Sequence, residues 1–119
     1  MKKGKKVSGG KYIKRRKKRL YELPGQKRIV KLGEKKKRAK KITGGNRKNF
    51  LLQSNEVNVQ AKGKSKKAKI KNVLETPSNR FLARQNIITK GTIVETDMGK
   101  VRITNRPTQE SVLNGVIIE

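Results

Sequence analysis

Residues 67–75, KAKIKNVLE, decide the fold class of this chain. Three lysines alternate here with Ala68 and Ile70, and successive side chains of a β-strand point to opposite faces of a sheet. The stretch therefore predicts a strand whose apolar face packs on a core and whose cationic face is open to a partner. Pro77-Ser78-Asn79 breaks the pattern and ends the strand.

Further strands are expected upstream of this stretch. Gly44-Gly45-Asn46 indicates a turn between strands over residues 36–43 and 48–54. Val57 and Val59 then continue the alternating pattern. The upstream part is thus expected to supply a hairpin and a third strand.

Downstream, Met98-Gly99 indicates a tight hairpin between residues 92–97 and 100–105, and the β-branched stretch 112–118 predicts a last strand. Short strands at regular spacing, without a long amphipathic helix, predict a mostly β chain that forms a small antiparallel β-barrel or sandwich. The residues expected in its core are Ile70, Val73, Leu74, Ile93, Val94, Val101, Ile103, Val112, Val116 and Ile118, together with Phe50 and Phe81.

The chain is strongly basic, with 34 Lys and Arg residues against 8 Asp and Glu, a net charge of +26. Such a charge opposes a compact state by self-repulsion, so a polyanionic partner is expected. Nucleic acid, an anionic membrane and an acidic protein all have this chemistry. A membrane is disfavoured because no apolar run approaches the about 20 residues of a span, and no apolar wedge or lipidation signal accompanies the cations.

The cations concentrate near the N-terminus, and the first 60 residues hold 22 of them. Residues 14–19 form an uninterrupted block of six, and blocks this long repel and stay extended in isolation. We therefore expect residues 1–35 to form a basic extension that is disordered until it binds, and residues 36–119 to form the β domain. A helix over residues 11–22, ended by Pro24-Gly25, is open as an alternative within the extension.

Residue types that many enzymes and metal sites need are missing. The chain has no His and no Cys, which excludes zinc fingers, disulfides, thiol nucleophiles and imidazole catalysis. Gly63-Lys64-Ser65 resembles the end of a phosphate-binding P-loop, but Asn58 stands where that motif needs Gly. Glu95 and Asp97 share one face of a strand, where ion pairs with nearby Lys and Arg are their expected role. We therefore expect no catalytic residue, metal, cofactor or small-molecule substrate.

Cations are the expected binding site, because Lys and Arg that neutralise phosphates release condensed counterions. The two Phe and two Tyr residues are too few to stack several bases, so backbone and shape should be recognised more than base sequence. The candidate nucleic-acid-binding residues are Lys14, Arg15, Arg16, Lys17, Lys18, Arg19, Lys36, Lys37, Arg38, Lys40, Lys41, Arg47, Lys48, Lys67, Lys69, Lys71, Arg80, Arg84 and Lys90.

Several stretches together carry a resemblance to a known family. They are Gly44-Gly45-Asn46-Arg47-Lys48, Pro77-Ser78-Asn79-Arg80, Asn86-Ile87-Ile88-Thr89-Lys90-Gly91 and Arg102-Ile103-Thr104-Asn105-Arg106-Pro107. They resemble the archaeal and eukaryotic small-subunit ribosomal protein eight, and the Asn-Ile-Ile-Thr-Lys-Gly stretch is the most specific of them. The resemblance covers nearly the whole chain, at the length of the short archaeal form.

This resemblance implies a β-barrel-like domain whose basic extension threads into small-subunit ribosomal RNA. It implies neighbouring small-subunit ribosomal proteins as further partners, a place in the cytoplasmic ribosome, and neither catalysis nor a cofactor. Two departures from the family pattern lie in one turn before the last strand. Thr108 replaces a usual Gly, and Glu110-Ser111 replaces a usual Asp-Gly.

Two other functions stay open on the residues alone. One is a ribosome assembly factor with a related β domain, and the other is a chromosomal architectural protein that coats DNA. DNA coating predicts a groove-reading helix or ribbon and similar affinities for duplex DNA and ribosomal RNA at matched salt. The sequence pattern predicts no such helix.

Overall fold

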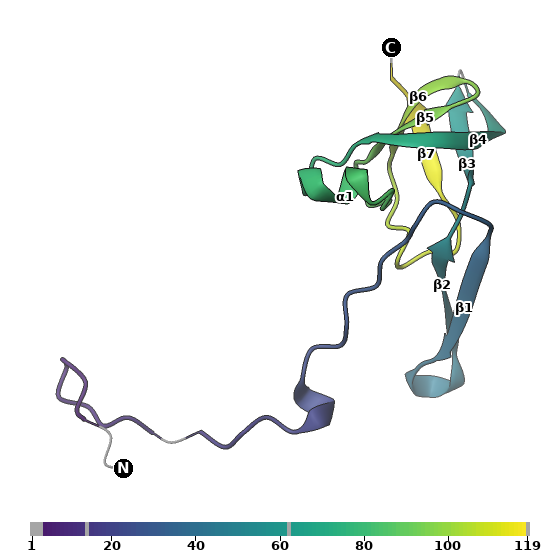
Figure 1. Ribbon diagram of the computed structural model, residues 1–119. Coiled ribbons are helices and arrows are strands. Elements are labelled where there is room, and N and C mark those ends of the chain that lie inside the picture. The colour runs from purple at the N-terminus through teal and green to yellow at the C-terminus, as the bar shows by residue number, and fades with distance from the viewer. Residues whose placement is uncertain (1–3, 14, 62, 119) are drawn as a thin grey trace.

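Figure 1 shows the fold as a computed structural model, which describes residues 4–13, 15–61 and 63–118. Five strands form a closed barrel, and two others form a separate two-stranded sheet. In chain order the elements are the 3-10 helix η1 (Leu20–Glu22), β1 (Lys36–Lys41), the 3-10 helix η2 (Thr43–Gly45), β2 (Arg47–Gln53), β3 (Glu56–Ala61), β4 (Lys64–Glu75), α1 (Arg80–Arg84), β5 (Ile93–Thr96), β6 (Gly99–Ile103) and β7 (Asn114–Ile117).

The barrel follows the order β3-β4-β5-β6-β7 and closes on itself. Each strand runs antiparallel to the next along the chain, whereas the closing pair, β3 with β7, is parallel. An odd number of strands that alternate in direction leaves the first and the last pointing the same way, so the seam has to be parallel. The predicted mostly β fold with a small barrel is confirmed, and its closing seam departs from a fully antiparallel arrangement.

β1 and β2 form the antiparallel hairpin that the Gly44-Gly45-Asn46 turn predicts. Both glycines have a positive φ, 83° for Gly44 and 78° for Gly45, a conformation that a side chain at Cβ disfavours. The Ile42 N–H donates to the Asn46 carbonyl at 2.9 Å and closes the tip. The hairpin projects from the barrel at the end opposite to the C-terminus (Figure 1), so most of its surface is open to solvent.

The prediction of the core is confirmed for five aliphatic residues of the barrel strands. Ile70, Val73, Val94, Val101 and Ile103 are all buried in one cluster. They come from β4, β5 and β6, which are neighbours in the barrel, so the period of two in the sequence correctly marks the inner face of these strands.

Other core predictions are wrong, and the structure shows why. Leu74 is 41% exposed because the register of β4 with β5 shifts between Val73 and Glu75, and this bulge turns the extra residue outward. Val116 is 43% exposed because Gly115 takes the inward position in β7, and neighbouring residues of a strand face opposite ways. Three further predicted core residues are only partly buried, namely Ile93, Val112 and Ile118.

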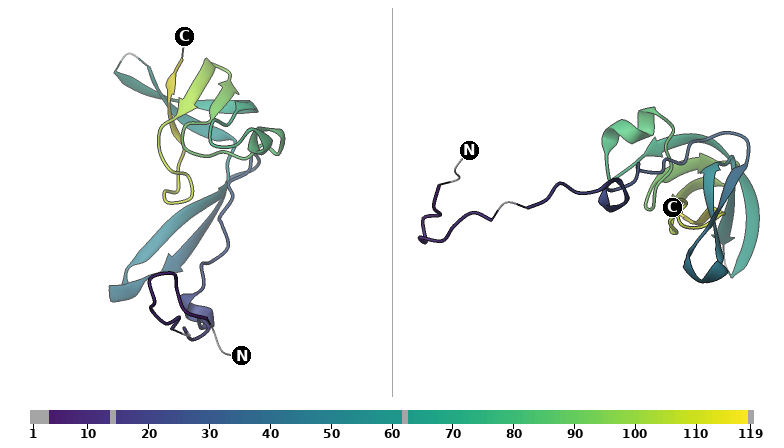
Figure 2. Two further views of the ribbon diagram at one scale, coloured as in Figure 1. Left: turned by 90° about the vertical axis from the view of Figure 1, so that its left-hand side faces the viewer. Right: turned by 90° about the horizontal axis from the view of Figure 1, so that it is seen from below.

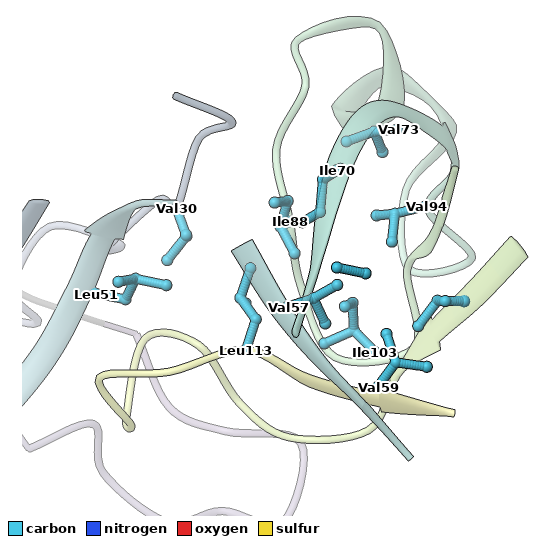
Figure 3. Close-up of a cluster of buried hydrophobic side chains, with 12 residues drawn as sticks. Val30, Leu51, Val57, Val59, Ile70, Val73, Ile88, Val94, Ile103 and Leu113 are labelled. Carbon is cyan, nitrogen blue, oxygen red and sulfur yellow. The ribbon is translucent and has the colours of Figure 1, made fainter. Parts of the chain in front are cut away.

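Residues from outside the predicted set complete the core (Figure 3). They are Val30, Leu51, Val57, Val59, Ile88 and Leu113, and Ala68, which the alternation in residues 67–71 already predicts to face the core, lies in the same cluster. Val30 and Leu51 lie side by side in Figure 3, with Ile88 on the side of the barrel. The cluster therefore continues from the barrel interior to the base of the β1–β2 hairpin.

The segment before β1 ties the hairpin to the barrel. The Lys31 N–H donates to the Leu52 carbonyl at 3.0 Å, and the Leu32 N–H donates to the Asn86 carbonyl at 2.9 Å. The Ile88 N–H donates to the Val30 carbonyl at 2.8 Å, and Val30 is fully buried. Part of the predicted extension is thus packed, and the division of the chain at residue 35 stays a prediction.

The remainder of the extension runs away from the barrel (Figures 1 and 2). The radius of gyration is 20.7 Å, against about 13–14 Å for a compact domain of this length. A helix over residues 11–22 is wrong for the described residues, where only the three-residue η1 forms. The dense cations there repel one another and oppose a regular helix. None of the described helices is long and apolar enough to cross a membrane.

Candidate nucleic-acid interface

The first cationic surface lies on the β1–β2 hairpin. Every residue of β1 is exposed, and neither strand contains Asp or Glu. The register places Lys40 opposite Lys48 and Lys41 opposite Arg47. Like charges directly opposite each other destabilise a strand pair, so a bound polyanion would stabilise this hairpin. We call its seven cations the hairpin surface; they are Lys36, Lys37, Arg38, Lys40, Lys41, Arg47 and Lys48.

The second surface is the outer face of β4, where the predicted alternation is confirmed. Lys67, Lys69 and Lys71 are exposed, while Ala68 and Ile70 between them are buried. The three lysines thus form a row on the outside of the barrel, where a phosphate backbone could contact them.

Carboxylates near the outer face of β4 neutralise it only weakly. Lys71 pairs with Asp97 at 3.5 Å, and both side chains are more than half exposed, so this ion pair contributes little. The role expected for Asp97 is confirmed. Lys69 lies opposite Glu56, whose carboxylate pairs with Lys35 at 3.6 Å.

The third surface is formed by α1 and the loop that follows it. Arg80, Arg84 and Lys90 are exposed. The Asn79 side chain caps α1 by accepting from the Phe81 N–H at 3.0 Å, and a hydroxyl hydrogen bond of 3.3 Å joins Ser78 to Thr89. The start of the helix and the Lys90 loop are therefore held close together.

Phe81 was predicted to be a core residue, and this is wrong because its side chain is 71% exposed. The short helix turns Leu82 and Ala83 inward instead, and Ala83 packs on the core cluster. The other predicted aromatic core residue, Phe50, is buried at 5% exposure. An exposed Phe between Arg80 and Arg84 gives the third surface an apolar centre.

The fourth group is the cationic block of the extension, which lies apart from the barrel and the hairpin (Figure 1). Its exposed members are Arg15, Arg16, Lys17, Lys18 and Arg19, and Lys14 lies outside the described residues. Arg16 differs from the others because its guanidinium donates to both oxygens of Glu22, at 2.8 and 2.5 Å. The Arg19 N–H adds a third hydrogen bond to this carboxylate at 3.0 Å.

Replacing Arg16 with alanine is expected to raise the pKa of Glu22 toward its ordinary value of 4.5. The hydrogen bond from Arg16 is the main cause that lowers this pKa, and the Arg19 N–H is the second. The pKa of Glu22 is lowered in the ordered turn. The Arg16–Glu22 ion pair therefore stabilises the turn at pH values above the ordinary pKa of Glu22, and this stabilisation is lost as the pH falls through the lowered pKa. NMR titration of the Glu22 carboxyl measures this, with K17A as a control that leaves the pKa unchanged. An unchanged pKa in R16A would assign the shift to the Arg19 N–H.

Sequence reasoning missed Arg28 as a site residue. Its guanidinium carbon lies 4.1 Å from the centre of the Phe50 ring. Arg28 stands outside the long cationic blocks, and only the folded chain brings it to Phe50 and to the hollow that Arg38 also lines. The one local signal is that Arg28 lies two positions before the buried Val30, which is the spacing of residues on one face of a strand.

The turn that carries the two departures from the family pattern packs on β2. The Leu51 N–H donates to the carbonyls of Pro107 and Glu110, at 3.3 and 3.2 Å. The Asn105 side chain donates to the Glu110 carboxylate at 2.8 Å, and Lys48 donates to the Gln109 side chain. Thr108, Glu110 and Ser111, which depart from the family pattern, therefore lie in a turn that is stabilised by its own hydrogen bonds.

Ion pairs leave most cations of these surfaces unneutralised. Among the residues that the structure describes, the pairs are Arg16–Glu22, Lys35–Glu56 and Lys71–Asp97. The hairpin surface therefore has no carboxylate partner within the described chain. This arrangement is suited to binding a polyanion by its charge.

Comparisons with known proteins agree with the motifs in the sequence. The family described as "Ribosomal protein S8e" matches residues 1–118. The chain is 47% identical to the small ribosomal subunit protein eS8 of Nanoarchaeum equitans over 115 residues, which cover 95% of this chain and 91% of the relative. Proteins of the same name match at 44% identity in Staphylothermus marinus, covering 96% and 91%, and at 39% in Methanosarcina barkeri, covering 96% and 93%.

Proposed function

Because this chain belongs to the ribosomal protein S8e family, we propose that it is a structural component of the small ribosomal subunit that binds and stabilises small-subunit ribosomal RNA. Its role is structural rather than catalytic, and it works in the cytoplasm as part of the ribosome. Its partners are the RNA and the neighbouring small-subunit proteins. The curated relatives, which cover most of the chain, are named small ribosomal subunit proteins, and this supports the proposal.

The observation that carries RNA binding is the set of exposed cations without carboxylate partners on the hairpin surface. Held in rows on strands, these cations can contact successive phosphates, and each contact releases counterions. The basic extension then adds phosphate contacts away from the barrel, and these offset the entropy lost when it becomes ordered on RNA. Three cations on the barrel, Arg80, Arg84 and Lys90, position the domain on the RNA.

A sucrose gradient of cell lysate tests this function. The protein is followed by mass spectrometry at low and at high salt. We expect it to migrate stoichiometrically with mature small subunits and whole ribosomes, and to stay there at high salt. Presence only in precursor fractions would support an assembly factor instead, and release into the chromatin fraction would support DNA coating.

The positioning role of α1 is tested by the double variant R80A/R84A. Loss of two phosphate contacts should lower the slope of log K against log salt by about 1–2 and weaken binding to small-subunit ribosomal RNA by roughly tenfold. Filter binding at several salt concentrations measures both quantities. The control K100A/R106A removes the same charge from exposed positions outside the candidate site and is expected to bind more tightly than R80A/R84A. Equal affinities of the two double variants would rule out a positioning role.

A further inference from the structure

A small hollow on the β1–β2 hairpin has the chemistry of an anion site. Its volume is about 270 Å³, and its lining residues are Arg28, Arg38, Ala39, Lys40 and Phe50. Three of the five are cations, and neither strand of the hairpin contains an acidic residue. Such a concentration of positive charge around a concave surface favours an anion there.

Arg28 lies over an aromatic ring at this hollow. Its guanidinium stacks 4.1 Å from the centre of the Phe50 ring, and Phe50 is itself 5% exposed and thus fixed by packing. A guanidinium stacked by its face keeps its N–H donors free, because they point outward in the plane of the group. In that arrangement the ring would present a planar fork of donors to an anion in the hollow.

The strand register brings the other two cations to the same face. Arg38 lies directly opposite Phe50, and Lys40 is two residues further along β1, where side chains return to the same side of the sheet. Lys40 in turn lies opposite Lys48. A phosphate in the hollow would accept hydrogen bonds from a planar fork and lie beside the neighbouring positive charges.

We propose that this hollow binds one backbone phosphate of RNA, with Arg28 as a bidentate ligand, Arg38 and Lys40 as flanking charges, and Phe50 as the positioning residue for Arg28. The proposal rests on the proposed function and adds to it a specific subsite that depends on shape as well as charge. Arginine matches two phosphate oxygens at once, whereas a lysine ammonium acts as a point charge. The subsite therefore distinguishes arginine from lysine at position 28.

The charge-conserving variant R28K tests this subsite. It keeps the net charge but loses the stacked planar fork, so we expect binding to small-subunit ribosomal RNA to weaken by about tenfold. The slope of log K against log salt should stay the same, because the number of positive charges is unchanged. The matched control is R106K, which makes the same change at an exposed position outside the candidate site and should bind as the wild type does.

A double-mutant cycle with F50L tests the positioning role of Phe50. Leucine keeps an apolar side chain in place but removes the ring, and a melting curve by circular dichroism checks that F50L is folded. We expect F50L to weaken RNA binding in the wild-type background and to have much less effect in the R28K background, since the two residues act together. Equal effects of F50L in both backgrounds would show that the ring does not act through Arg28.

The outcomes separate this subsite from the function on which it rests. Wild-type affinity in R28K, or equal losses in R28K and R106K, would overturn the subsite and leave RNA binding in place. A wild-type chain that does not bind small-subunit ribosomal RNA would overturn the proposed function, and the subsite with it.

Discussion

Replacing the five cations of β1 with threonine is expected to weaken binding to small-subunit ribosomal RNA by more than about a hundredfold at physiological salt, because each phosphate contact contributes through counterion release. The five are Lys36, Lys37, Arg38, Lys40 and Lys41, all exposed and none in an ion pair with a described carboxylate. The slope of log K against log salt should fall by roughly 4, at about 0.7–0.9 per contact. Filter binding or fluorescence anisotropy over a range of salt concentrations measures both.

The same variant is expected to change folding stability in the opposite direction. Lys40 opposite Lys48 and Lys41 opposite Arg47 repel in the free protein, and threonine has a high preference for strands. The melting temperature should therefore stay the same or rise while RNA affinity falls. A loss of affinity accompanied by unfolding would mean that the β1 side chains support the structure and not the interface.

A matched control removes an equal charge from the barrel. The five cations Lys64, Lys66, Lys100, Arg102 and Arg106 are exposed and lie outside the candidate site. Their replacement by threonine should reduce affinity much less than the change in β1 does. Equal losses in the two variants would show that RNA responds to net charge alone and that the hairpin surface is not a distinct site.

Replacing Gly115 with valine is expected to lower the free energy of unfolding by about 3 kcal/mol or more. A Cβ at Gly115 would clash with Cγ1 of Val101 and lie 2.9 Å from the Arg102 carbonyl oxygen. That oxygen belongs to β6, which pairs with β7. The backbone of β6 can therefore move away from a side chain at position 115 only if the pairing of these two strands is disturbed. The melting temperature should fall by roughly 10–20 °C, as followed by circular dichroism.

The control for this variant is G25V. Gly25 lies in the extension, has no heavy atom near the position of a Cβ, and has no positive φ. Its replacement should leave the melting temperature unchanged. If G115V melted together with the wild type, β6 and β7 would not pack as closely as the structure describes.

Much of the fold is predictable because its causes are local. The period-two pattern of β4 separates its buried from its exposed residues over a few positions, so Ala68 and Ile70 are recognised as inward. The Gly44-Gly45 turn requires a positive φ at both residues, which glycine tolerates best, so the hairpin is also recognised. The cationic rows of the candidate interface follow directly from these elements.

The errors occur where the cause lies elsewhere in the chain. Val116 was assigned inward from its β-branched side chain, but the close approach of β6 admits only Gly115 at the inward position. Phe81 was assigned to the core from its hydrophobicity, but in a five-residue helix the inward positions go to Leu82 and Ala83. Hydrophobicity alone does not say which face of a short element meets the core.

Local patterns and composition are enough to predict the mostly β class, the β1–β2 hairpin and the cationic outer face of β4, and they lead us to expect a polyanionic partner. These depend on alternation, turn residues and charge, which act over a few neighbouring residues or over the whole composition. The parallel seam between β3 and β7, the burial of Val30 and the contact of Arg28 with Phe50 are seen only in the folded chain. Each of these joins segments that are distant in sequence, and such contacts follow from how the whole chain packs, which no local pattern records.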